Sequence, residues 1–348
     1  KILKPYLVLS LLFLIQSVGY TQDKLEELVP IDDKVRTGHL ENGLKYFIQY
    51  NPKPENKLEL RLAIKAGAMQ ENENQLGLAH FVEHMAFNGS EHFEKNELIS
   101  YLQSIGVAFG SDLNAYTSFD ETVYMLPIPT DEEEKLNNGF QVMRDWAGGL
   151  LLNAEDIDAE RGIVVEEWRT GQGVSQRLRD AYLPVLLHES RYAERMPIGK
   201  MDIIRNAADS LVRQFYQDWY RPDLMAVVAV GDVAPDKVEK MIKEYFSDLE
   251  NPTNAPEREY YNVPAHKENF VKIITDEEAP GIQVQLYYKQ EARPSNNYED
   301  YKGRILRTMF GGMITQRLDE IRQKPDAPFI FAGASGVLLV QTSNAITW

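Results

Sequence analysis

Two histidines and a glutamate stand close together in the sequence, at His80, Glu83 and His84. The stretch Gly77–Phe87 around them contains no proline and has glycine only at its start, so we expect a helix. Residues four apart in a helix lie one turn apart on the same face, so both imidazoles can bind one divalent metal ion. Zinc suits such nitrogen ligands. Glu83 is rotated by about 100° around the helix from His84. It is close enough to accept a proton from a metal-bound water, but it is not turned toward the metal as an obvious ligand.

The order His-x-x-Glu-His reverses the more common zinc motif His-Glu-x-x-His and is typical of the inverzincins. The chain has 6 histidines and 53 acidic residues among 348. Composition alone then predicts the pattern about 0.01 times. The alternative is a core helix that buries two hydrogen-bonded histidines, since Ala79, Phe81 and Met85 are apolar. The low chance expectation favours the metal site.

The residues from Gly77 to Ser90, GLAHFVEHMAFNGS, resemble the signature of the insulinase/pitrilysin family of zinc metallopeptidases. The similarity continues along most of the chain. It implies an α+β fold, a LuxS/insulinase-like metallopeptidase domain in which an antiparallel or mixed sheet packs with helices. It also implies one Zn²⁺ per chain, with His80 and His84 as ligands and Glu83 as the catalytic base.

A catalytic zinc site needs a third protein ligand and an open position for water. A helix expected to begin near Asn153 carries Glu160 and Glu167 two turns apart on one face, with Glu166 rotated by about 100° from Glu167. From the residues alone, each glutamate is more often a solvated charge than a ligand. The family has a Glu-Arg-x-x-Val-x-x-Glu pattern, which residues 160–167 match. The resemblance implies that Glu167 is the third ligand and that Glu160 orients a ligand without touching the metal.

Residues 112–120 lie between two expected strands, Val107–Phe109 and Thr122–Ile128. From the pattern alone they form either an ordinary turn or an edge strand. The resemblance implies an edge strand beside the metal that pairs with the backbone of a peptide substrate. The residues that match this strand are Asn114, Ala115, Tyr116 and Thr117.

The composition limits the possible partners. Hydrophobic residues make up 43% of the chain and the formal net charge is −16. A nucleic-acid-binding protein needs a basic surface, so we expect no nucleic-acid partner. An acidic surface is usually only solvated, although it also favours basic peptides. The chain has no cysteine, which excludes disulfides and thiolate zinc sites.

The N-terminal residues resemble a secretory signal peptide. Lys1 and Lys4 precede an apolar run, Pro5–Ile15, that is too short for a membrane span of about 20 residues. We expect a signal peptide at residues 1–21, with cleavage after Gly19 or Thr21, and an uncleaved anchor is the alternative. The protein is then exported to a periplasmic or extracellular location, with no stable membrane anchor after cleavage.

The pattern of elements predicts two domains. Residues 22–250 form the expected zinc-binding catalytic domain, and residues 251–348 form part of a second domain of the same fold without the metal motif. Strands at Phe270–Thr275 and Ile282–Tyr288 and a helix at Asp300–Gln323 are expected there. The resemblance implies a second homologous half, in further C-terminal sequence or another subunit, that supplies Arg and Tyr groups near the substrate carbonyl.

These observations predict a zinc-dependent endopeptidase that hydrolyses peptides or small unfolded proteins with metal-activated water and Glu83 as general base. The alternative is a non-catalytic scaffold or partner subunit of the same fold. Such subunits usually lose a motif residue, whereas all four motif positions are present in this chain. A zinc-dependent binding protein without turnover is a weaker alternative.

Overall fold

The computed structural model describes residues 26–95, 97–107, 114–292 and 296–347. These residues form two compact units. One contains residues 32–264 and 268–279, and the other contains residues 26–31, 265–267 and 280–347. The expected signal peptide at residues 1–21 lies outside the described residues. Among the described residues, no helix combines the length and the apolar character needed to cross a membrane.

The larger unit is built on a six-stranded mixed sheet with the strand order β1-β2-β6-β3-β5-β4. Neighbouring strands are antiparallel, except that β2 and β6 run parallel. Buried and more exposed residues alternate along β3, because one face of the sheet packs on the core. The strands are β1 (Val35–His39), β2 (Lys45–Tyr50), β3 (Lys57–Ile64), β4 (Asn114–Thr117), β5 (Thr122–Pro129) and β6 (Met225–Gly231).

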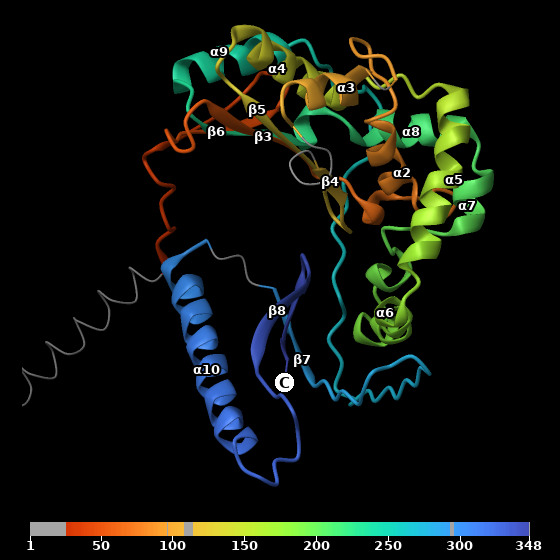
Figure 1. Cartoon of the computed structure of the whole chain (residues 1–348), viewed down its shortest axis with the longest axis vertical. Coiled ribbons are helices and arrows are strands. Elements are labelled where there is room, and N and C mark those ends of the chain that lie inside the picture. Colours follow the sequence, from red (N-terminus) through yellow and green to blue (C-terminus); the bar gives the residue numbers. More distant parts are fainter. Residues whose placement is uncertain (1–25, 96, 108–113, 293–295, 348) are drawn as a thin grey trace, which may run out of the picture. The chain divides into compact units, whose positions relative to one another are not determined.

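Helices gather on one side of this sheet, as Figure 1 shows. Large aromatic side chains such as Trp146, Phe140 and Phe215 are fully buried between the helices and the sheet. The helices are α2 (Leu78–Met85), α3 (Glu97–Ser104), α4 (Glu133–Gly148), α5 (Ala154–Gly171), α6 (Val174–Leu186), α7 (Met201–Asn206), α8 (Asp209–Trp219) and α9 (Pro235–Phe246). Short 3-10 turns are η1 (Ala68–Gln70), η2 (Arg191–Glu194) and η3 (Pro222–Leu224).

The smaller unit contains one long helix and a three-stranded antiparallel sheet with the order β7-β9-β8. The helix is α10 (Tyr298–Arg322), and the strands are β7 (Tyr287–Glu291), β8 (Ser335–Val340) and β9 (Ser343–Thr347). The Asn297 side chain caps α10 by accepting a hydrogen bond from the amide of Asp300 at 2.8 Å. The metal motif lies in the larger unit.

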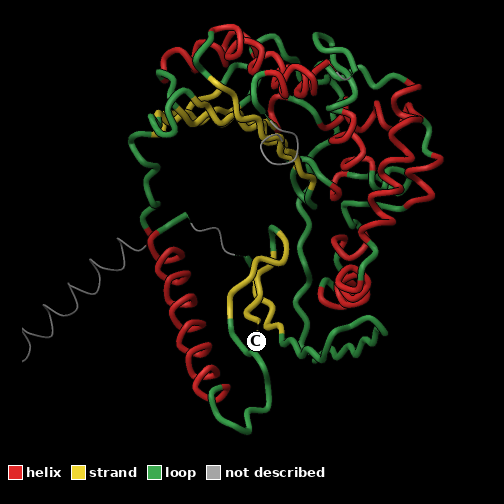
Figure 2. Tube along the Cα trace, viewed as in Figure 1, coloured by secondary structure: helices red, strands yellow, loops and turns green. Residues whose placement is uncertain are grey.

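The α+β class and the mixed sheet packed with helices are confirmed, and most predicted elements are present within a few residues. The strand predicted at Phe270–Thr275 is wrong, since this stretch forms neither strand nor helix (Figure 2). Val271 and Ile273 give it a strand-like pattern, but their side chains are 83% and 85% exposed. A strand needs a neighbour to pair with, and in the described part of the chain none pairs with this segment. The strand predicted at Ile282–Tyr288 is wrong over most of its length, since residues 282–286 form no strand and β7 begins only at Tyr287. Most of the strand expected at Val107–Phe109 lies outside the described residues.

Two glycines bring the backbone before α2 against the loop before α7. Gly77 and Gly199 both have positive φ angles, +101° and +73°. A Cβ atom on Gly199 would lie 2.2 Å from the Cα of Gly77, closer than any side chain can approach. The amide of Lys200 also donates a hydrogen bond to the carbonyl of Leu76, at 3.2 Å. This close approach sets the position at which α2 begins.

We therefore expect Gly199→Ala to lower the free energy of unfolding by about 2–4 kcal/mol, through the left-handed backbone and the overlap with Gly77. Gly162→Ala is the matched control, because Gly162 lies inside α5 with no atom within 4 Å of its would-be Cβ. Gly162→Ala should raise the free energy of unfolding by about 0.5–1 kcal/mol. Urea unfolding of both variants measures the difference, and equal effects would contradict the close approach.

Candidate metal centre

Helix α2 presents its two histidines from a well-packed backbone. Most of its other residues are buried in the core, namely Leu78, Ala79, Phe81, Val82 and Met85. His80 and His84 lie one turn apart, and their ring centroids are 4.6 Å apart with an interplanar angle of 76°. The apolar face holds the helix in the core, so both imidazoles are presented together at its less buried face.

The structure brings Glu167, on α5, to these two imidazoles. The distance from Oε2 of Glu167 to Nε2 is 3.1 Å for His84 and 3.8 Å for His80. The three candidate ligand atoms all lie within 4.8 Å of one another. Ligand atoms around a tetrahedral zinc ion, with bonds of about 2.0–2.2 Å, stand roughly 3.3–3.6 Å apart. The donor set, two imidazole nitrogens and one carboxylate oxygen, therefore fits zinc in chemistry and in spacing.

The neighbouring Glu166 points elsewhere. Its carboxylate pairs with Arg169 at 2.7 Å, and its side chain is 59% exposed. Neighbouring residues of a helix point about 100° apart, so Glu167 on α5 faces the histidines while Glu166 faces solvent. Glu167 and not Glu166 is positioned to be a ligand.

Glu160 lies two turns before Glu167 and is buried beside His84. Its Oε1 is 2.8 Å from Nδ1 of His84, and its Oε2 accepts a hydrogen bond from the side-chain amide of Asn88 at 2.7 Å. This contact orients the ring of His84, so that Nδ1 faces Glu160 and Nε2 faces Glu167. The sequence prediction missed Asn88, although its position four residues after His84 is a signal that could have found it.

The electrostatics of this cluster favour a positive charge. Burial, together with repulsion from His84, lowers the pKa of His80 to about 4. Burial alone would lower the pKa of His84, but its hydrogen bonds with Glu160 and Glu167 raise that pKa to about 9. The hydrogen bond with His84 in turn lowers the pKa of the Glu167 carboxyl. A proton on His84 or a divalent cation between the three groups can supply the positive charge.

Glu83 stands next to the cluster but outside the group of three. Its side chain is buried, and its Oε2 accepts a hydrogen bond from the hydroxyl of Thr117 at 2.6 Å. Burial raises the pKa of the Glu83 carboxyl, and the hydrogen bond from Thr117 opposes that rise. A carboxylate with a raised pKa is a better acceptor for the proton of a water molecule.

Strand β4 lies at the edge of the six-stranded sheet, next to α2. It pairs with β5 from Asn114, opposite Met125, to Thr117, opposite Thr122. Its other edge carries no partner strand within the described part of the chain. The edge strand expected at Asn114–Thr117 is thus present. That Asn114, Ala115, Tyr116 and Thr117 bind substrate stays a prediction.

A second set of ligand-type side chains, Glu91, His92 and Asp145, also lies together. Asp145 is buried, and its carboxylate accepts hydrogen bonds from the Ser90 hydroxyl at 2.6 Å, the His92 amide at 3.0 Å and the Gln141 amide at 2.9 Å. These bonds satisfy the carboxylate without a metal ion. The set therefore holds the turn before α3 against α4.

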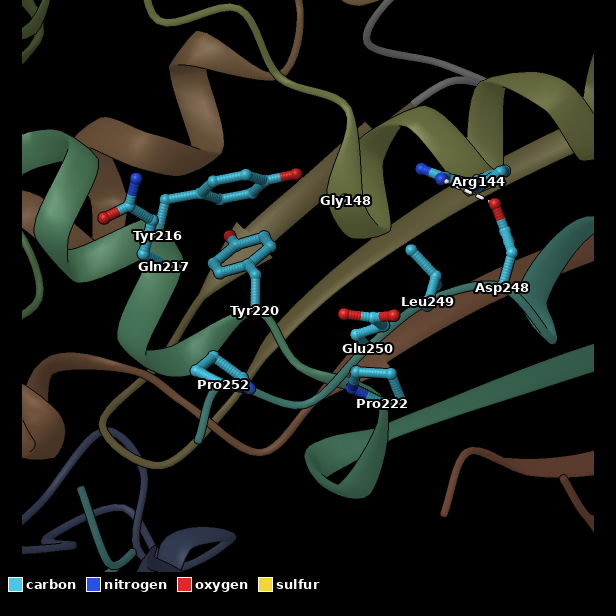
Figure 3. A pocket seen from close by; sticks show the side chains of 10 residues that line it. All are labelled: Arg144, Gly148, Tyr216, Gln217, Tyr220, Pro222, Asp248, Leu249, Glu250 and Pro252. Atoms are coloured by element: carbon cyan, nitrogen blue, oxygen red, sulfur yellow. Dashed lines mark hydrogen bonds and ion pairs between the residues drawn. The ribbon is translucent and has the colours of Figure 1, made fainter. Parts of the chain in front are cut away.

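A hollow of about 460 Å³ opens elsewhere in the larger unit. Figure 3 shows the rings of Tyr216 and Tyr220 on its wall and the ion pair between Arg144 and Asp248, at 3.1 Å, near its rim. None of its lining residues belongs to the His80 cluster. The His80 cluster is therefore separate from this hollow.

Comparison with known proteins identifies two family matches. Residues 46–196 match the family described as insulinase (peptidase family M16), and residues 210–336 match the peptidase M16 inactive domain. His80, Glu83, His84 and Glu167 all lie within the first of these two stretches.

Individual relatives agree with these matches. The chain is 36% identical over 308 residues to the probable zinc protease PqqL of Escherichia coli, covering 88% of this chain and 33% of that protein. It is 35% identical over 327 residues to a zinc protease PQQL-like protein of Arabidopsis thaliana, covering 94% and 34%. The crystal structure of the first half of the periplasmic protease PqqL from Escherichia coli superposes with a TM-score of 0.85 at 34% identity, covering 92% of this chain and 69% of that one. The chain spans about a third of the length of these curated relatives.

Proposed function

The chain belongs to the insulinase family, peptidase family M16, and we propose that it is the zinc-binding part of an endopeptidase that cleaves peptides or small unfolded proteins. The observation that carries the proposal is the convergence of His80, His84 and Glu167, with the carboxylate 3.1 Å and 3.8 Å from the two imidazoles. Relatives that are named zinc proteases support it.

Each residue of the cluster has a distinct part in the proposed reaction. His80, His84 and Glu167 would hold one zinc ion, and Glu160 would hold the ring of His84 through Nδ1. Zinc bound there supplies a Lewis acid that polarises the scissile carbonyl and lowers the pKa of water. Glu83 takes a proton from the attacking water and delivers it to the leaving amine.

Strand β4 is the proposed binding site for the substrate backbone. Its outer edge at Asn114–Thr117 has no partner strand within the described part of the chain, and an extended peptide can add to it as a further strand. Backbone pairing holds the scissile bond near Glu83 with little dependence on the peptide sequence. Thr117 links the two functions, since its hydroxyl contacts Glu83 while its backbone lies in the edge strand.

The proposed enzyme also needs a second homologous half. We assign residues 22–250 to the catalytic domain and residues 251–348 to part of a second domain, and the chain spans about a third of its curated relatives. The other half would supply further groups to the substrate carbonyl, from additional sequence or another subunit. Export to a periplasmic or extracellular location is supported by the basic and apolar residues 1–15 and by the solved periplasmic relative.

The scaffold alternative has less support. All four motif residues are present, and the three candidate ligands converge. The match to an inactive domain covers residues 210–336, which contain none of these four residues. The catalytic proposal therefore explains the cluster better.

Zinc content and chelation test this proposal. We expect about one zinc ion per chain by atomic absorption, as a site with three protein ligands requires. A protein extended to the length of its relatives should cleave an unfolded peptide, lose cleavage with a chelator and regain it with added zinc. A protein that binds no zinc would contradict the proposal and favour the scaffold alternative, and zinc binding without cleavage would favour the zinc-dependent binding protein.

A further inference from the structure

One buried carboxylate near α2 has no place in the mechanism described so far. The side chain of Glu71 is fully buried, in the loop between η1 and α2. Its Oε1 accepts a hydrogen bond from the backbone amide of Ala79 at 2.9 Å, and the amide of Gly77 also donates to this carboxylate. The carboxylate thus binds the first turn of the metal helix from outside that helix.

Helix α2 has no cap of its own. Gly77 stands at the N-cap position and has no side chain to offer, and the first turn contains no acidic residue. The first amides of a helix lack partners within the helix, and a buried amide without a partner is costly. Gln75 satisfies one of them, because its carbonyl accepts from the amide of Leu78 at 2.8 Å. Glu71 takes the place of the missing cap for the next amide.

The loop holds Glu71 firmly in this position. The guanidinium of Arg191 donates hydrogen bonds to the backbone carbonyls of Met69, at 3.2 Å, and of Glu71 itself, at 2.6 Å. The side chain of Gln70 accepts a hydrogen bond from the amide of Gly67 at 2.9 Å. The backbone before and at residue 71 is therefore held in place, and the carboxylate binds the first turn of α2.

The two histidines of α2 are held in different ways. The ring of His84 is oriented by Glu160 through Nδ1, at 2.8 Å. Nδ1 of His80 is buried and has no hydrogen-bond partner among the described residues. The position of the His80 ring therefore depends on its backbone, and His80 is the third residue of α2, directly after Ala79.

Burial raises the pKa of Glu71 to about 8, although the amides of Ala79 and Gly77 oppose the rise. Arg191 and Arg195 oppose it further. The carboxyl can thus serve as a hydrogen-bond acceptor without carrying a full charge at neutral pH. A glutamine, which keeps an acceptor oxygen at the same place, should replace it.

We propose that Glu71 is a positioning residue of the metal centre, which caps α2 from the preceding loop and so places His80 beside His84 and Glu167. This inference rests on the proposed zinc site. A metal ion needs its ligands held to within a few tenths of an ångström, and fraying of the first turn would move His80 while leaving His84 held by Glu160.

A pair of variants of similar size isolates the acceptor. Glu71→Met removes the acceptor without a large cavity, and Glu71→Gln keeps it. Asp145→Ala is the control for general loss of stability, since Asp145 is a buried carboxylate that caps a different turn. The zinc dissociation constant is measured by competition with a chromophoric chelator. Hydrogen exchange at residues 77–85 is measured on the zinc-free proteins.

We expect Glu71→Met to weaken zinc binding by about 10- to 100-fold and to speed exchange at residues 77–85. Glu71→Gln should stay close to wild type in both, and Asp145→Ala should lower the melting temperature without weakening zinc binding. If Glu71→Met does not fold, Arg191→Gln, which loosens the backbone of residue 71, should shift both readouts in the same direction.

The inference is overturned if the acceptor-free variant binds zinc as tightly as wild type. It is also overturned if Glu71→Gln binds zinc as weakly as Glu71→Met does, or if Asp145→Ala weakens zinc binding to the same extent. If the wild-type protein bound no zinc, the proposed function itself would be contradicted. Exchange at residues 77–85 would then still decide whether Glu71 caps the helix.

Discussion

Replacing Glu83 by glutamine is expected to lower the turnover number for peptide cleavage by a factor of about 10² to 10⁴ while leaving zinc bound. The amide has nearly the same shape and can still accept the hydrogen bond that Thr117 donates to Oε2 at 2.6 Å. It cannot take a proton from water. The loss should therefore fall on turnover and not on the zinc content, because Glu83 lies outside the group of three candidate ligands.

Cleavage of an unfolded peptide by the full-length protein, with zinc measured by atomic absorption, checks this result. Wild-type-like turnover in Glu83→Gln would remove Glu83 from the role of base. Loss of zinc together with turnover would show that Glu83 supports the metal instead.

The pH dependence offers a second readout of the same residue. Burial raises the pKa of Glu83, and only the ionised carboxylate can accept a proton. Wild-type activity should thus be present above this raised pKa and fall as the pH drops through it, at a higher pH than for an ordinary glutamate. The residual activity of Glu83→Gln should lack this fall. If both proteins lost activity over the same acidic pH range, that loss would belong to a group other than Glu83.

Replacing Glu167 by glutamine is expected to weaken zinc binding by a factor on the order of 100 or more. A neutral amide is a poor zinc ligand, and the two imidazoles would lose the carboxylate that stands 3.1 Å and 3.8 Å from them. Peptide cleavage should fall with the zinc content and partly return when zinc is added in excess.

The neighbouring glutamate provides a matched control. Glu166→Gln makes the same chemical change one residue earlier on α5, but Glu166 is exposed and pairs only with Arg169 among the described residues. Its zinc affinity and activity should equal those of wild type. If Glu166→Gln weakened zinc and Glu167→Gln did not, the candidate ligand would be wrong.

The parts of the site that lie within one helix could be predicted from the sequence. His80 and His84 share a face because the helix repeats every 3.6 residues, whatever the rest of the chain does. The same periodicity places Glu160 and Glu167 on one face of α5. The edge strand at Asn114–Thr117 followed from a resemblance and not from its own pattern, which also allowed a turn.

The parts that depend on distant residues could not be predicted in this way. The loop residue Glu71 contacts the start of α2 from a separate segment, so no local repeat marks it. Asn88 stands four residues after His84, but its hydrogen bond to Glu160 depends on how α5 packs beside α2. The strand predicted at Phe270–Thr275 failed for a related reason. Its alternating residues have the right composition, but pairing is decided by whether another strand lies alongside.

The sequence by itself thus determined the type of centre, two imidazoles and a nearby acid on one helical turn, because backbone geometry alone relates residues that are four apart. Only the tertiary structure showed that the carboxylate of Glu167, which the family pattern had implied, lies next to both imidazoles, and that Glu71 caps the helix that carries them. These contacts join α2 to α5 and to a separate loop. Their distances are set by how the helices and loops pack on the sheet.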